Sequence, residues 1–513
     1  MLRAFSLSHS LAVFSTAMRR SLLATALALY LPPATFGQDA ESSDSASSSA
    51  DRGKSYGVSP AYEGDLPTLS AINLRTATLS RLDVELEEPW AFEFVSATEI
   101  LLTERKARLL RIILGEPARL IEVKSLPEIT TRHQQTGLLD VALHPDFDRN
   151  RRIYFSYVSD DPATGNYYLT AVATAILSGE RLTGVQTVIE AGPHGWSPSN
   201  FGGALEFLGD GTLLVSVGDR SEHGLAQRGD RLQGKILRLH DDGRVPEDNP
   251  FVDDPEVDDR IWALGLRNVQ GLVRDPVSGN VYASSHGPLG GDEVNLIRPG
   301  RNYGWPTVTY GRNYNTSRMG TGTHAPGFEQ PLFYYLPSEA ISPLEIYRGD
   351  LFTDWDGDLL VGALKGKHVS RLDLDGNIVR SEYPILREID DRIRDIKVAP
   401  DGTVWILGQT TGLWQLGLNP EPPVTDNPAN GKAVYGMACA GCHDSGAGDA
   451  PMLEAGCRWD AIAGKGREKL HANVRDGIGN MPERGLCYLC EDRHLEAAVD
   501  FMLDSAADCE TGD

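Results

Sequence analysis

Between about residues 66 and 418 the chain alternates short apolar runs with turn-forming residues. Runs such as Ile153–Val158 and Leu213–Val217 have the length and the β-branched or aromatic content of strands. A turn of the form Pro/Gly-Asp-Gly-Thr precedes a strand-like run at Gly209–Thr212 and again at Pro400–Thr403. Few stretches have the period of a long amphipathic helix. Repeated small sheets predict an all-β propeller, and roughly 350 residues suit six blades; a pair of β-sandwiches is the alternative.

The first residues have the pattern of an export signal. Arg19 and Arg20 precede the apolar run Leu22–Leu31, which is too short to span a bilayer, and small residues follow it. We therefore expect a signal peptide over residues 1–37 and a periplasmic or secreted protein; an uncleaved anchor is the alternative. The segments predicted after it are a flexible Ser-rich tether over 38–65, the propeller over 66–418, a Pro-rich linker over 419–430 and a second domain over 431–513.

Composition narrows the possible partners. The 513 residues carry a formal net charge of −24, and 41% of them are hydrophobic, enough for large cores. So acidic a chain repels nucleic acids and anionic membrane surfaces. No stretch after the signal approaches the length of a transmembrane helix, so we expect no membrane anchor once the signal is removed.

The motif Cys439-Ala440-Gly441-Cys442-His443 indicates a covalent c-type haem. Each thiol forms a thioether to a porphyrin vinyl group, and the adjacent His supplies the proximal ligand of the iron. Met481, followed by Pro482, is the candidate for the other axial ligand. A disulfide or a thioredoxin-like pair beside an incidental His is the alternative.

The stretch from Gly431 to the C-terminus resembles the class I cytochromes c, most closely the c5 type, which implies a small all-α domain ending in a helix near Leu495–Leu503. The resemblance covers a second C-x-x-C pair, Cys487 and Cys490. No His follows Cys490, so a small disulfide is the better interpretation. Cys457 and Cys509 remain, and whether they pair cannot be derived from the sequence.

The middle domain resembles the soluble PQQ-dependent glucose and aldose dehydrogenases (the glucose/sorbosone dehydrogenase family), which are six-bladed propellers. Five motifs carry the resemblance, and together they are specific. They are Gln135–Phe147, Gly234–Leu239 through Asp248–Phe251, Gly265–Gly271, His286–Leu296 and Arg301–Pro306.

The resemblance implies a site for pyrroloquinoline quinone (PQQ), a tricarboxylate o-quinone. Lys365, Arg392 and Arg394 match cationic contacts of its carboxylates and quinone, and arginine forks suit carboxylates. Because Arg392 and Arg394 alternate as in a strand, both side chains can enter one cavity. Further matches are Asn268 and Gln270 beside the cofactor, Arg267 in a catalytic position, and Gln135 and Asp219 near the substrate.

The resemblance also implies calcium. Gly287 and Pro288 match a loop whose backbone carbonyls hold Ca²⁺ against the quinone, and oxygen ligands suit this ion. Glu293, with the carbonyl of Tyr303, matches a second, structural Ca²⁺ site. A solvated turn is the alternative interpretation of the acidic pair Asp292-Glu293.

One position departs from the family. The family's general base is a His before Phe-Gly-Gly, whereas this chain has Asn200, and an amide has no useful proton affinity near neutral pH. Asn200 is therefore assigned only to the substrate side of the pocket. His194 is a candidate replacement from a nearby loop, and His286 is expected to line the cofactor pocket.

The sequence thus predicts an exported quinohaemoprotein that oxidises the C1 hydroxyl of an aldose with PQQ and Ca²⁺ and passes electrons singly to its own haem, then to an acceptor such as another cytochrome. A nicotinamide enzyme is disfavoured because no GxGxxG motif occurs in a strand–helix setting. Two alternatives remain: a catalytically impaired propeller that binds carbohydrate or a partner while the haem carries electrons, and oxidation of a non-sugar alcohol.

Overall fold

The computed structural model describes residues 59–60, 77–160, 167–193, 195–418, 431–444, 446–487 and 490–506. Within these residues the chain forms sheets up to residue 418 and helices after residue 431. No helix among the residues described is both long and apolar enough to cross a bilayer.

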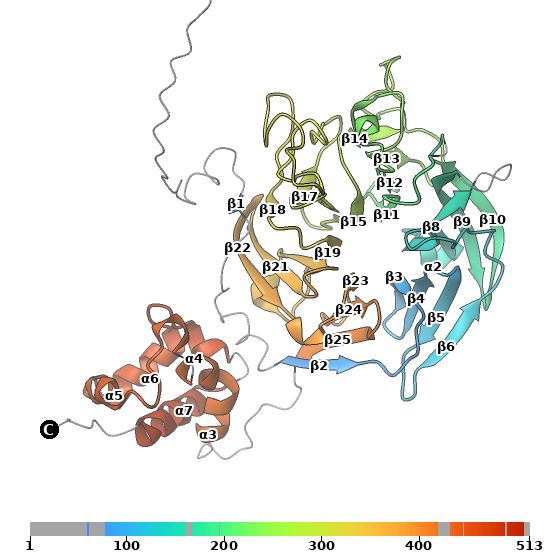
Figure 1. The fold of residues 1–513 in the computed structure, drawn as a ribbon. Coiled ribbons are helices and arrows are strands. Elements are labelled where there is room, and N and C mark those ends of the chain that lie inside the picture. The colour runs from blue at the N-terminus through green and yellow to red at the C-terminus, as the bar shows by residue number, and fades with distance from the viewer. Residues whose placement is uncertain are drawn as a thin grey trace, which may run out of the picture. The chain divides into compact units, whose positions relative to one another are not determined.

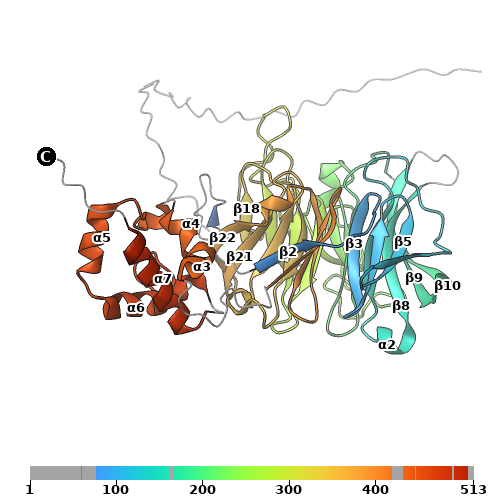
Figure 2. The same cartoon turned by 90° about the horizontal axis from the view of Figure 1, so that it is seen from below.

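Six sheets follow one another around a ring, and Figure 2 shows the same sheets edge-on. In chain order the sheets begin with β3 (Pro89–Ser96), β4 (Glu99–Glu104), β5 (Arg108–Ile113) and β6 (Arg119–Val123), followed by β7 (Leu138–Leu143), β8 (Arg152–Asp160), β9 (Tyr168–Ser178) and β10 (Arg181–Glu190). The third and fourth sheets hold β11 (Gly202–Phe207), β12 (Leu213–Val217), β13 (Lys235–Leu239) and β14 (Ile261–Leu264), then β15 (Val269–Arg274), β16 (Val281–Ser285), β17 (Asp292–Ile297) and β18 (Phe333–Tyr335). The last two hold β19 (Ile341–Ile346), β20 (Leu359–Ala363), β21 (Val369–Asp375) and β22 (Ile378–Ile385), then β23 (Ile393–Val398), β24 (Val404–Gly408) and β25 (Gly412–Leu418).

The ring closes in two ways. The innermost strand of each sheet contacts the innermost strand of the next sheet, and the last of them, β23, contacts β3 (Figure 1). The innermost strands are β3, β7, β11, β15, β19 and β23. In addition β2 (Ala77–Arg81) pairs antiparallel with β25, so the N-terminal strand completes the last sheet. Radial closure leaves only short sheet edges, and the predicted six-bladed propeller is confirmed. Two residues of the segment expected to be a tether form β1 (Ser59–Pro60), which pairs parallel with β18.

The blades pack through apolar side chains between neighbouring sheets. Every residue of β12 and β20 is buried, as expected for central strands covered on both faces. Outside the sheets, the described residues of the propeller form only short helical turns. They are α2 (Phe147–Asn150), η2 (His223–Gln227), η3 (Thr353–Trp355) and η4 (Arg387–Ile389).

Carboxylates gather on the innermost strands, around the ring's axis. Asp140 of β7 accepts a hydrogen bond from the backbone N of Leu205 at 2.8 Å, and Asp395 of β23 accepts one from Phe92 at 2.8 Å. These bonds join adjacent blades. Burial raises the pKa of Asp140 to about 6 and that of Asp395 to about 8, although the nearby ammonium of Lys397 opposes the shift. Burial likewise raises the pKa of Glu345 to about 7 and that of Glu206 to about 8.

Because the pKa values of these carboxyl groups are raised, we expect the stability of the propeller to depend on pH. A carboxyl whose pKa is higher in the folded protein keeps its proton there, so the free energy of unfolding falls as pH rises through the folded pKa. We expect the propeller's melting temperature to fall between about pH 5 and pH 9. Over the same pH range, Glu206→Gln should reduce the fall in the free energy of unfolding by on the order of 1–2 kcal/mol, as measured by calorimetry at each pH. An equally steep fall in Glu206→Gln would contradict this assignment.

The C-terminal part is a small helical domain, as predicted (Figure 2). Its main apolar core joins α7 to the segment that carries the Cys-x-x-Cys-His motif, through Val434, Trp459, Leu495 and Met502. The predicted last helix near Leu495–Leu503 is α7. The elements are α3 (Gly431–Val434), η5 (Tyr435–Cys439), α4 (Ala440–His443), η6 (Ala447–Asp449), α5 (Gly456–Ala463), α6 (Arg467–Asp476), η7 (Glu483–Leu486) and α7 (Asp492–Ser505).

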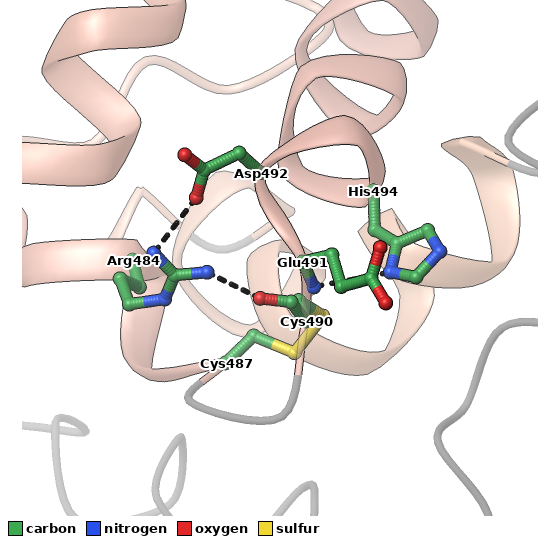
Figure 3. Close-up of a disulfide and its surroundings, with 6 residues drawn as sticks. All are labelled: Arg484, Cys487, Cys490, Glu491, Asp492 and His494. Carbon is green, nitrogen blue, oxygen red and sulfur yellow. Dashed lines mark hydrogen bonds and ion pairs between the residues drawn. A yellow bond between two sulfur atoms is a disulfide. The ribbon is translucent and has the colours of Figure 1, made fainter.

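Cys487 and Cys490 form a disulfide just before α7, as the sequence indicated (Figure 3). Both sulfur-bearing side chains are buried in the helical core. Arg484 holds the same turn, because it donates to the carbonyl of Cys490 and pairs with Asp492. Cys457 is also disulfide-bonded; Cys509, whose pairing with Cys457 the sequence left open, lies outside the described residues.

Removing the disulfide between Cys487 and Cys490 should lower the stability of the helical domain. A double Cys487→Ala, Cys490→Ala variant should unfold the helical domain at lower denaturant, with a loss of about 2 kcal/mol in the free energy of unfolding. Haem absorbance during guanidinium titration of the full chain would report it. The control is Arg484→Lys, which keeps the disulfide and should change stability by less than about 1 kcal/mol. A double variant as stable as the parent would show that the bridge adds nothing.

Candidate active site and haem crevice

A cavity of about 440 Å³ lies where the N-terminal ends of the innermost strands meet. Trp90 of β3, Leu139 of β7 and Gly202 of β11 line one side, and the residues at the starts of β15, β19 and β23 line the other. Its volume suits one drug-sized organic ligand. Most residues that the sequence singled out are brought to this cavity: Gln135, Asn200, Arg267, Asn268, Gln270, His286, Gly287, Pro288, Lys365, Arg392 and Arg394.

The cavity wall is strongly cationic. Arg392 Nε and Arg394 Nη2 both donate to Gln409 Oε1, at 3.0 and 2.7 Å, so one amide holds the two arginines side by side. The guanidinium of Arg394 lies 4.4 Å from the ring centre of Trp90. Burial lowers the pKa of Arg394 to about 9, and neighbouring Arg392 adds to the shift. Lys365 is more exposed and donates to the Ser338 carbonyl at 3.0 Å.

Several buried nitrogen atoms in this wall have no hydrogen-bond partner among the described residues. They are Arg267 Nε, Arg394 Nε and His286 Nε2. Unpaired buried donors beside unpaired positive charge are costly in an isolated protein. An anionic ligand in the cavity would compensate the positive charge of this wall. The residues present therefore fit a polycarboxylate cofactor such as PQQ.

His286 is held neutral in this setting. Burial, together with the charges of Arg267 and Arg394, lowers the pKa of its ring to about 3. His286 therefore lines the cavity as an uncharged ring.

The loop predicted to hold the quinone-bound Ca²⁺ is tightly organised. The side chain of Asp292 accepts hydrogen bonds from the Gly287 N at 2.8 Å and the Ala340 N at 2.6 Å. Asp292 thus ties the Gly287–Pro288 turn to the start of β19. Arg267 Nη1 donates to the Gly287 carbonyl at 3.0 Å, so this oxygen already has one partner and one lone pair remains for a cation.

The second predicted calcium position contains a carboxyl group and an amide oxygen without a partner in the described residues. Burial raises the pKa of the Glu293 carboxyl to about 7. Its hydrogen-bond partner is Asn295 Nδ2, at 3.3 Å, and Asn295 Oδ1 is buried without a partner in the described part of the chain. Within that part no three His, Cys, Asp or Glu side chains gather as metal ligands, so a cation here would rely on carbonyl and amide oxygens. Tyr303 is buried, and its hydroxyl donates to the Leu296 carbonyl at 2.7 Å.

Asn200 connects the cavity to a buried carboxylate. Its Nδ2 donates to Asp219 Oδ1 at 2.8 Å. Asp219 is fully buried and also accepts from Trp305 Nε1 at 2.9 Å, and its Oδ2 lies 2.6 Å from His223 Nδ1. Although burial alone would raise the pKa of Asp219, its hydrogen bond with His223 and the charge of Arg267 hold the pKa below the usual value.

Sequence reasoning named Asp219 but missed His223 and Trp305. His223 follows Asp219 by four residues, which was a usable signal, whereas Trp305 is 86 residues away. His194, the candidate replacement base, lies outside the described residues.

A second cavity, of about 390 Å³, lies in the helical domain. Cys439, Cys442, His443 and Met481 all line it, and the remaining wall is largely apolar. The Nδ1 atom of buried His443 lies 2.9 Å from the Pro451 carbonyl. This bond favours the tautomer that leaves Nε2 free to bind a metal. Two backbone hydrogen bonds of 2.9 Å between Ile478 and Met481 fix the methionine loop, so the crevice fits a haem with His and Met ligands.

Comparisons with known proteins agree with both parts. Residues 86–413 match the Glucose / Sorbosone dehydrogenase family and residues 426–502 match Cytochrome C oxidase, cbb3-type, subunit III. Since the first match covers more than half of the chain, the protein belongs to the glucose/sorbosone dehydrogenase family. It also carries a cytochrome c domain.

Individual relatives are consistent with this. "Aldose sugar dehydrogenase YliI" of Escherichia coli is 37% identical over 351 residues, which are 67% of this chain and 93% of the relative. The crystal structure of the soluble aldose sugar dehydrogenase from Escherichia coli in the apo-form superposes with a TM-score of 0.63 and 36% identity, over 67% of this chain and all of that one. A PQQ-bound aldose sugar dehydrogenase from Streptomyces coelicolor has the same fold, with a TM-score of 0.55 and 24% identity over 67% of this chain and 98% of that one.

The C-terminal part has its own relative. Cytochrome c5 of Azotobacter vinelandii is 33% identical over 75 residues, which are 14% of this chain and 90% of that protein. The chain is therefore a sugar dehydrogenase propeller joined to a cytochrome c domain, which together define an oxidoreductase of sugars with cytochrome-type electron transfer.

Proposed function

We propose that the protein is an exported quinohaemoprotein that oxidises the C1 hydroxyl of an aldose to the lactone, with PQQ and Ca²⁺ in the propeller and a c-type haem as the first electron acceptor. The observation that carries the proposal is the cationic cavity wall, with buried Arg267 and Arg394 nitrogens that have no partner in the described structure. Such a wall is destabilising unless an anionic ligand compensates it. The PQQ-bound relative supports that ligand's identity.

Each group of residues has a distinct part in this proposal. Lys365, Arg392 and Arg394 would bind the carboxylates, and the oxygens of Gly287 and Pro288 would hold the Ca²⁺. PQQ, when bound, supplies the acceptor for the hydride that leaves C1. Gln135 and Asn200 face the same cavity and would orient the sugar hydroxyl, but neither can take its proton, which would pass to water.

In the helical domain, Cys439 and Cys442 would hold the porphyrin through thioethers, and His443 and Met481 would bind its iron. Thioether attachment and disulfides both suit a compartment outside the cytoplasm, which fits the proposed export. A further acceptor, such as another cytochrome, would then reoxidise the haem.

Spectroscopy of the full-length protein tests this. The purified protein is incubated with PQQ and Ca²⁺, a panel of aldoses is supplied, and haem reduction is followed by absorbance. We expect reduction only when PQQ, Ca²⁺ and an aldose are all present. A Cys439→Ala, Cys442→Ala variant should still reduce an artificial dye with the same sugars but show no haem signal. Haem reduction without PQQ, or none with any aldose despite PQQ binding, would refute the proposal.

A second function is favoured by one residue. Asn200 stands where the family's base would be, so the propeller could bind carbohydrate or a protein partner without turnover, while the haem carries electrons. Under this alternative, PQQ binds and raises the melting temperature, but no sugar or non-sugar alcohol reduces the haem.

A further inference from the structure

Protons released in the cofactor cavity have no acceptor in its wall. Oxidation of an aldose C1 hydroxyl to the lactone releases two electrons and two protons, and a haem takes up only the electrons, one at a time. None of the described residues that line the cavity is an Asp or a Glu. His286, the one His among them, has a pKa of about 3 and stays unprotonated near neutral pH. On the proposed function, the protons therefore need acceptors beyond this wall.

A small cavity of about 30 Å³ adjoins the cofactor cavity. Residues of all six innermost strands line it, so it lies on the axis of the ring. A buried water needs on the order of 10–15 Å³ of such space, so the small cavity has room for water. The residues that line both cavities are Trp90, Gly202, Gln270 and Arg394. The two cavities are therefore direct neighbours.

The wall of the small cavity contains the proton acceptors that the larger cavity lacks. Asp140 of β7 and Asp395 of β23 line it, together with Lys397. Each of the four oxygens of these two carboxyl groups accepts one backbone N–H at 2.8 Å. Since a carboxyl oxygen has two lone pairs, one remains on each oxygen for a water in the cavity. Both carboxyl groups can thus exchange protons with that water.

Further carboxyl groups continue from the small cavity along the axis. Lys397 Nζ lies 3.4 Å from Glu93 Oε2, and these two side chains remain 23% and 29% exposed although they lie on innermost strands. Water therefore reaches them inside the ring. The ammonium of Lys397 opposes the rise in the pKa of carboxyl groups on four innermost strands, which places it among them, near the axis. These groups are Asp140, Glu206, Glu345 and Asp395. The strand β15 adds no charged side chain to the wall of the small cavity.

We propose that the axis of the propeller is a proton exit for the cofactor cavity. Water in the small cavity takes up each released proton, and Asp395 or Asp140 accepts the proton from that water. The carboxyl groups around Lys397 then pass it to the solvent that reaches Glu93. For each sugar oxidised, two electrons go to the haem and two protons leave along the axis, so the charges balance. The proposal rests on the proposed aldose oxidation and adds the route of its protons.

The proton affinities along this route suit proton transfer. A group passes protons on most effectively when its pKa lies near the ambient pH. Asp140 has a pKa of about 6, Glu345 of about 7, and Asp395 and Glu206 of about 8. Ordinary carboxyl groups, with a pKa of about 4, hold a proton too weakly for this near neutral pH. The carboxyl groups on the axis can therefore both take up and release protons.

Infrared spectroscopy tests the route without sugar turnover. The full-length protein is loaded with PQQ and Ca²⁺, reduced with dithionite and reoxidised with ferricyanide. The difference spectrum should contain a band of protonated carboxyl groups that shifts in D₂O, because the axis exchanges protons with the cavity as the charge there changes. Asp395→Asn and Asp140→Asn should each lower the amplitude of this band by about half. Asp146→Asn is the matched control, since the Asp146 side chain is 60% exposed and lines neither cavity.

Kinetics in H₂O and D₂O test the route during turnover. With glucose as substrate and ferricyanide as the terminal acceptor, Asp395→Asn should slow steady-state oxidation about tenfold. Proton exit then limits the rate, so the ratio of the rates in H₂O and D₂O should rise about twofold above that of the parent. A merely structural role would lower the melting temperature without changing this ratio. Asp140→Asn, on another blade, should behave in the same way and serves if Asp395→Asn does not fold.

Two results would overturn the proton exit. One is a carboxyl band that is absent from the parent, or that is unchanged in Asp395→Asn and Asp140→Asn. The other is a parent-like rate and isotope ratio in both variants, which would mean that protons leave through the mouth of the cofactor cavity. If PQQ binds but no aldose is oxidised, the proposed function fails, whereas the infrared band still decides whether the axis exchanges protons with the cavity.

Discussion

Asn200→His is expected to raise the rate of aldose oxidation by about 10²-fold to 10⁴-fold, the usual contribution of a positioned general base. Asn200 lines the cavity and already donates to Asp219 at 2.8 Å. An imidazole at this position can donate Nδ1–H to the same carboxylate and present Nε2 to the sugar hydroxyl, the orientation a buried carboxylate gives a catalytic His. The backbone there has φ of 56°, a conformation in which His, like Asn, is enriched.

The rate of aldose oxidation by the Asn200→His variant should depend on pH. Because the new base must be unprotonated, the rate should fall as pH drops below about 6.5, a limb that the parent protein lacks. Haem reduction by glucose between pH 5 and 9 would measure it. Asn200→Gln is the control without a base, and Asp219→Asn added to Asn200→His should remove most of the gain. An unchanged rate in Asn200→His, with PQQ bound normally, would favour the binding function.

Arg394→Met is expected to have opposite effects on the cofactor-free protein and on cofactor binding. Arg394 is half-buried, its Nε is buried and has no partner in the described structure, and burial lowers its pKa to about 9. An apolar side chain of similar length removes that desolvation cost, so the cofactor-free protein should gain on the order of 1 kcal/mol in stability. PQQ should bind about 100-fold more weakly, since one buried charge pair is lost.

Thermal unfolding with and without PQQ separates the two effects. The melting temperature without PQQ should rise, while the further rise caused by PQQ should shrink, because that rise follows the ratio of ligand concentration to Kd. Arg149→Met is the control, since the Arg149 side chain is 85% exposed and remote from the cavity's lining. A variant that binds PQQ as tightly as the parent would remove Arg394 from the proposed cofactor site.

Part of the functional sites can be predicted from the sequence because the residues concerned are neighbours in the chain. The five residues from Cys439 to His443 must be adjacent to hold one porphyrin, so the motif is visible without any tertiary information. Arg392 and Arg394 could be placed on one side of a strand by alternation, and they do line one cavity. Gln409, which holds both of them, could not be anticipated, since it is brought in by the neighbouring strand β24 and its turn.

The polar cluster around Asp219, next to Asn200, shows more clearly what the sequence cannot predict. Asp219 was predicted from the family resemblance, but its contact with Trp305, 86 residues further along the chain, was not. The carboxylates around the ring's axis, such as Asp140 and Asp395, look in sequence like the exposed face of an ordinary strand. Only ring closure places them together and raises their pKa values.

By itself, the sequence determined the repeated short strands, the separate helical domain, the thioether motif and the absence of the family's base at Asn200, because each is set by neighbouring residues or by a matched motif. The tertiary structure decided which side chains share a cavity, which buried nitrogens remain unpaired, and which carboxyl groups line the small cavity beside it. The physical reason is that the cavity exists only where six strand ends, distant along the chain, are brought together by closure of the ring.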